Sequence, residues 1–80
     1  MIRRWRASRS ALRHMFAKHG VTWNEVDEIL SQEPKVLRSR TVRGEPRYLC
    51  RGRTAAGRKL VVIFAMEGTT ARVITAYEDR

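Results

Sequence analysis

An unbroken apolar run rich in β-branched residues, Leu60-Val61-Val62-Ile63-Phe64-Ala65, stands in the last third of the chain. A run of this kind, without polar alternation, is typical of a central strand that is buried on both faces. The chain has only 80 residues, so one modest hydrophobic core has to cover that strand. We therefore expect a single domain over residues 1–80. This length excludes a doubly wound nucleotide-binding fold and a TIM barrel, and no apolar run approaches the roughly 18 residues of a membrane span.

Two helices are predicted before this strand. The first has apolar and aromatic side chains at helical spacing and ends at Gly20, a natural left-handed stop. Its spaced residues are Leu12, Met15, Phe16 and His19, and its N-cap is Ser8 or Ser10.

A capping box gives the strongest local signal and starts the second helix. In Thr22-Trp23-Asn24-Glu25, the Thr22 hydroxyl accepts from the amide of residue 25, and the Glu25 carboxylate accepts from the amide of Thr22. Val21 and Val26 occupy the staple positions on either side of the box. The helix is expected to bury Val26, Ile29 and Leu30 and to end at Pro34.

The second half of the chain is predicted to form strands. They are expected at residues 47–53, 58–66 and 71–77, with turns at 55–57 and 67–70. Residues 35–39 are a short ambiguous segment, and residues 2–6 are a candidate edge strand. We therefore expect an α+β fold in which two N-terminal helices pack on a three- to four-stranded antiparallel sheet.

The chain is strongly cationic. It has 17 Lys and Arg against 8 Asp and Glu, for a net charge of +9, and 14 of the cations are arginine. The flat guanidinium fork pairs with phosphate oxygens two at a time. Positive charge is densest over residues 35–60, where Glu45 is the only acid. The expected partner is nucleic acid, an acidic protein, or both, and no membrane, because no basic helix carries a wide apolar face.

The sequence contains no metal-ligand constellation, no glycine-rich phosphate loop and no Ser-His-Asp order. The single Cys50 fits a buried strand residue in a reducing cytoplasm. What remains is many cations with a few histidines and tyrosines. Such a set can cleave RNA without a metal or cofactor, because RNA supplies its own nucleophile, the 2′-hydroxyl. It equally fits a binder whose arginines only neutralise phosphates.

The chain resembles the BrnT-type toxins of bacterial type II toxin–antitoxin systems over roughly residues 11–77. The matching motifs are Lys18–Val26 ("KHGVTWNEV"), Glu45–Tyr48, Gly52–Thr54, Gly57–Ile63 and Arg72–Ala76 ("RVITA"). The resemblance implies a small cytoplasmic ribonuclease with a RelE-like fold. Such proteins cleave RNA without a metal and are neutralised by a cognate antitoxin that also binds DNA.

The resemblance also indicates site residues. By position it points to the end of the first helix and to arginines on three strands: Lys18, His19, Arg47, Arg53 and Arg72. Our hypothesis is that His19 or Tyr77 moves protons, while Arg53, Arg72 and Lys18 hold the scissile phosphate. The predicted RNA-binding cations are Lys18, Arg47, Arg51, Arg58 and Lys59. No metal and no cofactor are expected.

The sequence departs from the family pattern after the last predicted strand. Family members usually continue with an "SAR" segment and one or two basic helices, whereas here Thr75-Ala76-Tyr77-Glu78 stands at that place and the sequence ends at Arg80. Structural interpretations also stay open, because His19 suits the negative end of a helix dipole and Tyr77 suits cross-strand packing. The alternative function is a non-catalytic basic BrnT-like module that binds a host protein or nucleic acid by the same surface.

Overall fold

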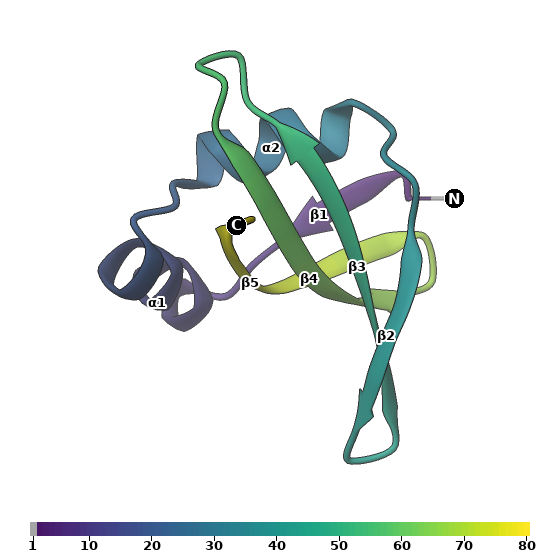
Figure 1. Ribbon diagram of the computed structural model, residues 1–80. Helices are drawn as coiled ribbons and strands as arrows, with labels where there is room; N and C mark the ends of the chain where they lie inside the picture. The colour runs from purple at the N-terminus through teal and green to yellow at the C-terminus, as the bar shows by residue number, and fades with distance from the viewer. Residues whose placement is uncertain (1) are drawn as a thin grey trace.

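The computed structural model describes residues 2–80, which form two helices and one five-stranded sheet (Figure 1). The strands lie in the order β1-β5-β4-β3-β2. All neighbouring strands are antiparallel except β1, which runs parallel to β5. The elements are β1 (Arg4–Arg6), α1 (Arg9–His19), α2 (Trp23–Ser31), β2 (Leu37–Val42), β3 (Glu45–Arg53), β4 (Lys59–Glu67) and β5 (Thr70–Glu78).

The predicted three- to four-stranded antiparallel sheet is wrong in strand number and in strand direction. The difference lies in the two edge strands. β1 has three residues, with an arginine on each side of Trp5, and it pairs with residues 70–72 of β5. A parallel partner so distant in sequence leaves no local pattern. β2 overlaps the ambiguous segment 35–39 and continues to Val42. Its hairpin with β3 turns at Arg43-Gly44, where φ is 51° and 78°. Two successive positive φ values are typical of tight hairpin turns.

The predicted helix caps are confirmed. The Ser8 side chain accepts from the amide of Ala11 at the start of α1, and Gly20 ends that helix with φ 65°. The Thr22 hydroxyl accepts from the Glu25 amide at 3.3 Å, and Glu25 accepts from the Thr22 amide at 3.0 Å. Because α2 begins at Trp23, only three residues after the left-handed Gly20, the end of α1 is fixed against the start of α2. The second helix ends at Ser31, before Pro34.

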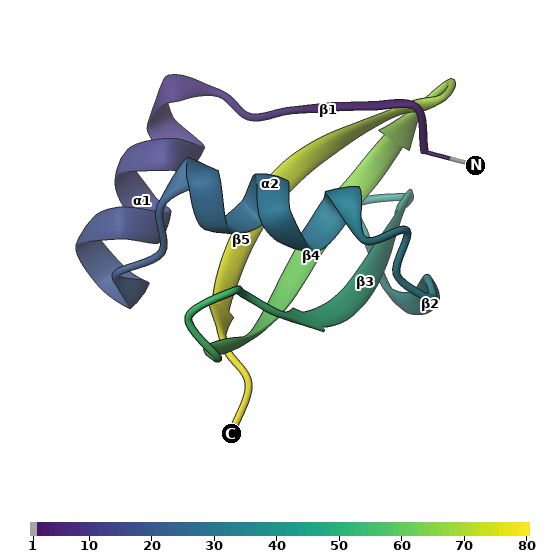
Figure 2. The ribbon, with the colours of Figure 1, turned by 90° about the horizontal axis from the view of Figure 1, so that it is seen from above.

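Both helices cover one side of the sheet and leave the other side bare (Figure 2). α1 packs against β5, and α2 packs against β3 and β4. The core between the two layers includes Met15, Val26, Ile29, Leu60, Val62 and Phe64. We call the uncovered side the helix-free face. No helix within residues 2–80 is long or apolar enough to cross a membrane.

The central strand β4 is buried on both faces over part of its length, as its composition predicts. Its even-numbered residues face the helices, while Val61 and Ala65 are buried on the helix-free face. Val61 is in register with Arg51 on one side and Tyr77 on the other. The side chains of Arg51 and Tyr77 therefore flank Val61 on the helix-free face, which no helix covers.

The antiparallel pairing of β4 and β5 contains an irregularity. Ile63 pairs with Thr75, but Phe64 pairs with Val73, so Ile74 is an extra residue on β5. Such a β-bulge changes the direction of the side chains next to it. The bulge lies beyond residues 70–72, where pairing with β1 stops.

Candidate active site

Cationic side chains of β3 share the helix-free face with an aromatic side chain of β5. Arg47, Arg51 and Arg53 are separated by even numbers of residues, so strand alternation puts them on the same side. Arg51 aligns with Val61, and Val61 aligns with Tyr77. Arg51 and Tyr77 therefore lie on one rung of the sheet, with their Cα atoms about 10 Å apart.

A cleft of about 330 Å³ lies where the end of α1 meets the end of β5. The His19 and Tyr77 rings both line it and contact each other, with centroids 5.9 Å apart and planes tilted by 52°. Exposed Lys18 lines the same wall as His19. The left-handed turn at Gly20 ends the helix directly after His19, which leaves the imidazole at the helix terminus beside the strand. The lining residues are Lys18, His19, Arg58, Tyr77, Glu78 and Arg80.

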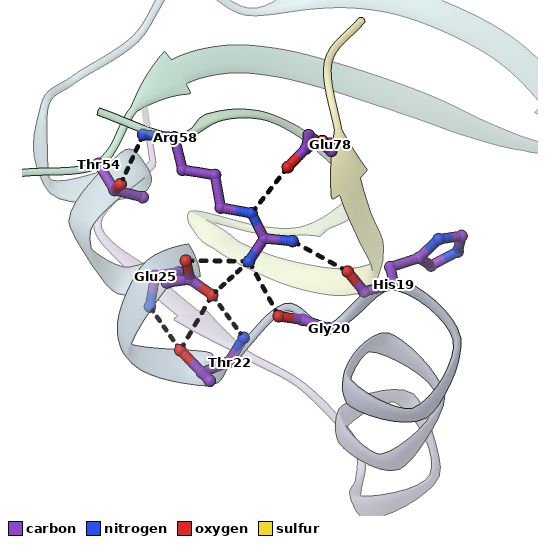
Figure 3. A network of polar contacts seen from close by, with 7 residues as sticks. All are labelled: His19, Gly20, Thr22, Glu25, Thr54, Arg58 and Glu78. Carbon is purple, nitrogen blue, oxygen red and sulfur yellow. Dashed lines mark hydrogen bonds and ion pairs between the residues drawn. The ribbon is translucent and has the colours of Figure 1, made fainter. Parts of the chain in front are cut away.

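Arg58 connects the elements that form this cleft (Figure 3). Its Nη2 donates to the His19 carbonyl at 3.0 Å, and its Nη1 donates to the Gly20 carbonyl at 2.9 Å. Nη1 also lies 3.1 Å from both carboxylate oxygens of Glu25, and Nε donates to Glu78 at 3.1 Å. One guanidinium thus holds the end of α1, the capping box of α2 and the end of β5.

The ionisation of these groups follows from the contacts. The carboxylates of Glu78 and Glu25 raise the pKa of Arg58. Burial favours the neutral form of Glu25, but the bonds from the Thr22 amide and from Arg58 outweigh burial, so the pKa of Glu25 is lowered. Glu25 and Arg58 are therefore both charged at neutral pH, and the donors of Arg58 are used inside the protein.

Arg72 is held in a similar way nearer the β1 edge of the sheet. Its Nη2 donates to both oxygens of Glu45 at 2.7 and 2.6 Å, and its Nε donates to Glu67 at 3.0 Å. Glu67 also pairs with Arg6, and Glu45 pairs with Arg47 at 3.2 Å. The hydrogen bond with Arg72 lowers the pKa of Glu45. This end of the helix-free face is therefore a row of alternating charges rather than a purely cationic surface.

Other cations have fewer carboxylate partners or none. Within residues 2–80, Lys18, Arg53 and Lys59 make no ion pair, and Arg51 has the single partner Asp79, at 3.4 Å. Arg53 and Lys59 are in register across β3 and β4. The same residues contain no group of three His, Cys, Asp or Glu side chains placed to hold a metal ion. The chemistry of the cleft is that of an imidazole, a phenol and an ammonium group beside unpaired cations.

The comparison with known families decides the identity of the chain. The family model described as "Ribonuclease toxin, BrnT, of type II toxin-antitoxin system" matches residues 5–79. The chain belongs to the BrnT family.

A solved BrnT structure has the same fold. The crystal structure of the Brucella abortus ribonuclease toxin, BrnT, aligns with a TM-score of 0.71 and 22% sequence identity, over 100% of this chain and 97% of that one. No curated protein sequence matches the chain. The predicted BrnT resemblance is thus confirmed, and nearly all of the Brucella chain lies inside the match.

The structure brings some of the predicted BrnT site residues together and separates others. Lys18, His19, Arg58 and Tyr77 line the cleft. Arg72 lies on the same face as Tyr77 but five residues earlier on β5, a distance of about 16 Å along the strand. Arg47, Arg51 and Arg53 stand on the neighbouring β3, and Lys59 begins β4. The predicted roles of these residues in catalysis and RNA binding stay predictions.

Two features of the site were not predicted. The His14 ring lies 5.8 Å from the His19 ring, so the two histidines and Tyr77 form a row beside β5. The signal in the sequence was that His14 and His19 lie on one predicted helix, five residues apart, with His19 directly before Gly20. The second feature is the bulge at Ile74 and Thr75, for which the sequence offers no local signal. Cys50 lies outside the site: it is buried, and burial raises its pKa to about 11, so its thiol stays protonated.

Proposed function

We propose that this BrnT chain is a metal-independent endoribonuclease toxin that cleaves RNA at the cleft lined by Lys18, His19 and Tyr77. The single observation behind this proposal is the contact between two proton-transfer side chains, whose ring centroids lie 5.9 Å apart, with a lysine at the same cleft. Two such groups beside one cleft can serve the attacking and the leaving oxygen of a phosphodiester bound there.

The reaction needs only the substrate and these side chains. His19 accepts the proton of the RNA 2′-hydroxyl, since an imidazole exchanges protons near neutral pH. The 2′-oxygen forms a bond to phosphorus, the bond to the 5′-oxygen breaks, and Tyr77 donates a proton to that leaving oxygen. The products are a 2′,3′-cyclic phosphate and a 5′-hydroxyl end. Lys18 stabilises the charge that develops on the phosphoryl oxygens.

The RNA strand is held by the cations beside the cleft. Arg51 lies on the same rung as Tyr77, and the unpaired Arg53 and Lys59 follow toward the turn between β3 and β4. Arg58 has an internal role instead, because its donors are engaged by Glu25, Glu78 and two carbonyls. Arg72 is too far along β5 to share the scissile phosphate, and its donors are engaged by Glu45 and Glu67.

The proposed cellular role is that of a type II toxin. RNA cleavage in the cytoplasm would inhibit translation, and a cognate antitoxin would neutralise the protein. A basic surface of this kind suits an antitoxin segment that carries carboxylates.

The test is cleavage of end-labelled RNA by the purified protein in EDTA. We expect fragments that end in 2′,3′-cyclic phosphate, and no cleavage of the same RNA with 2′-O-methyl groups. His19→Ala should lower kcat by about 100-fold or more. Arg13→Gln, on the exposed side of α1, removes one cation away from the cleft and serves as the matched control.

Two outcomes would contradict the proposal. If His19→Ala cleaves at the wild-type rate, His19 has no catalytic role. If the wild-type protein binds RNA with a strong salt dependence but never cleaves it, the protein is a binding module instead.

A further inference from the structure

A second hollow lies next to the cleft on the helix-free face. It has a volume of about 430 Å³ and spans β2, β3, β4 and β5. Its apolar residues come from three strands: Val42, Ile63 and Ile74. Its polar residues include Arg47, Thr75 and Tyr77. We call it the sheet hollow.

The bulge in β5 creates part of this lining. In a regular strand, Ile74 and Thr75 would point to opposite faces. Because Ile74 is the extra residue opposite Ile63 and Phe64, both Ile74 and Thr75 line the sheet hollow. An isoleucine is thereby placed on a face that is otherwise rich in arginine. Bulges are frequent beside functional sites, where they redirect a side chain.

One buried polar atom at the hollow has no partner within residues 2–80: the Thr75 hydroxyl oxygen. Arg47 Nε makes no hydrogen bond of good geometry either, but it lies 3.2 Å from a carboxylate oxygen of Glu45 as an ion pair. Buried polar groups in proteins are almost always hydrogen-bonded, so the Thr75 hydroxyl needs an explanation. A hydroxyl both donates and accepts. A flat ligand with hydrogen-bonding groups along its edge would satisfy it.

The sheet hollow and the cleft share one lining residue, Tyr77. Whatever occupies the hollow is therefore the neighbour of a group that reacts in the cleft. Arg40 and Arg47 also line it and supply positive charge. An apolar floor, polar edge atoms and adjacent cations together match a nucleobase attached to a phosphate chain.

We propose that the sheet hollow binds the nucleobase next to the scissile phosphate and selects it through Thr75. This inference rests on the proposed ribonuclease function for its catalytic consequence, but the binding itself does not require cleavage. The base contacts Ile63 and Ile74 with its face, and its edge exchanges hydrogen bonds with the Thr75 hydroxyl.

The first test measures binding without catalysis. The methyl resonances of Ile63, Ile74 and Thr75 are followed while the four nucleoside monophosphates, ribose 5-phosphate and inorganic phosphate are added to the full chain. We expect shifts at these methyls with at least one nucleotide and none with the two base-free compounds. Equal shifts with ribose 5-phosphate would overturn the proposal, because the hollow would then respond to phosphate alone.

The second test uses variants of the hollow. Ile74→Trp fills it and should weaken nucleotide binding about tenfold. Thr75→Val keeps the side-chain shape and should change the preference among the four bases about three- to tenfold. Val36→Trp adds the same bulk at an exposed residue of another surface and should leave binding unchanged. Thr75→Val still decides the question if Ile74→Trp does not fold.

The two proposals fail separately. If the wild-type protein cleaves no RNA, the ribonuclease proposal falls, and the methyl shifts alone decide whether the hollow takes a base. If RNA is cleaved but Thr75→Val keeps the wild-type ratios of kcat/KM for RNAs that differ in the base beside the cleaved bond, the base subsite is overturned while the ribonuclease stands.

Discussion

Arg58 is the single residue on which the geometry of the cleft most depends. It bonds the carbonyls of His19 and Gly20 and the carboxylates of Glu25 and Glu78. Arg58→Gln leaves these acceptors without a cation, so we expect the free energy of unfolding at pH 7 to fall by about 2–3 kcal/mol. Urea unfolding measures this loss, and Arg13→Gln should change the value by less than about 0.5 kcal/mol.

The pH dependence of that loss has a definite sign. Because the pKa of Glu25 is lowered in the folded protein, its ionised form adds stability above the unfolded pKa, and this is lost as pH falls through the folded pKa. The difference between the wild-type protein and Arg58→Gln should therefore narrow below pH about 4. A difference that stays constant down to the lowest pH at which both fold would mean that the contact with Glu25 adds little.

At the scale of elements, α2 and the residue after it pack tightly against β3 at Gly52. A Cβ atom there would lie 3.0 Å from two side-chain carbons of Ile29 and 3.1 Å from the Gln32 amide oxygen. Gly52→Ala should thus lower the free energy of unfolding by about 1–3 kcal/mol. In the Ile29→Val background, which removes one of the two carbons, the cost of Gly52→Ala should be smaller. Equal costs in both backgrounds would show that Ile29 is not the obstacle.

The elements that the sequence could predict are those with local signals. Ser8, Gly20 and the Thr22–Glu25 capping box set the helices through contacts between residues a few positions apart, and each cap is confirmed. The apolar composition of residues 60–65 likewise predicted the buried strand β4. For β1, the sequence offered a candidate edge strand at residues 2–6 but neither its partner nor its direction, since these arise from pairing with residues 70–72. The bulge at Ile74 also arises from the pairing of two strands and not from either strand alone.

At the scale of the whole molecule, the sequence could predict a cationic surface but not how its charges pair. Arg58 and Arg72 match the family motifs as well as Arg53 does, yet the fold gives each of the first two its own carboxylates. Those partners come from distant segments, such as Glu25 for Arg58 and Glu45 for Arg72. Net charge therefore indicated the class of ligand. Only the tertiary structure separates the cations that are paired with carboxylates of the protein from those that make no ion pair.

The difference between paired and unpaired cations should appear in the salt dependence of RNA binding. Arg53 makes no ion pair within residues 2–80, so its contact with an RNA phosphate would displace only counterions. Arg53→Gln should reduce the slope of log affinity against log salt by about 0.7, the value for one phosphate of a single strand. Binding of a 2′-O-methyl oligonucleotide over a salt series measures the slope without cleavage. Arg13→Gln, on the far side of α1 from the sheet strands, should leave it unchanged, and an equal reduction by both variants would indicate a diffuse field instead of a defined RNA path.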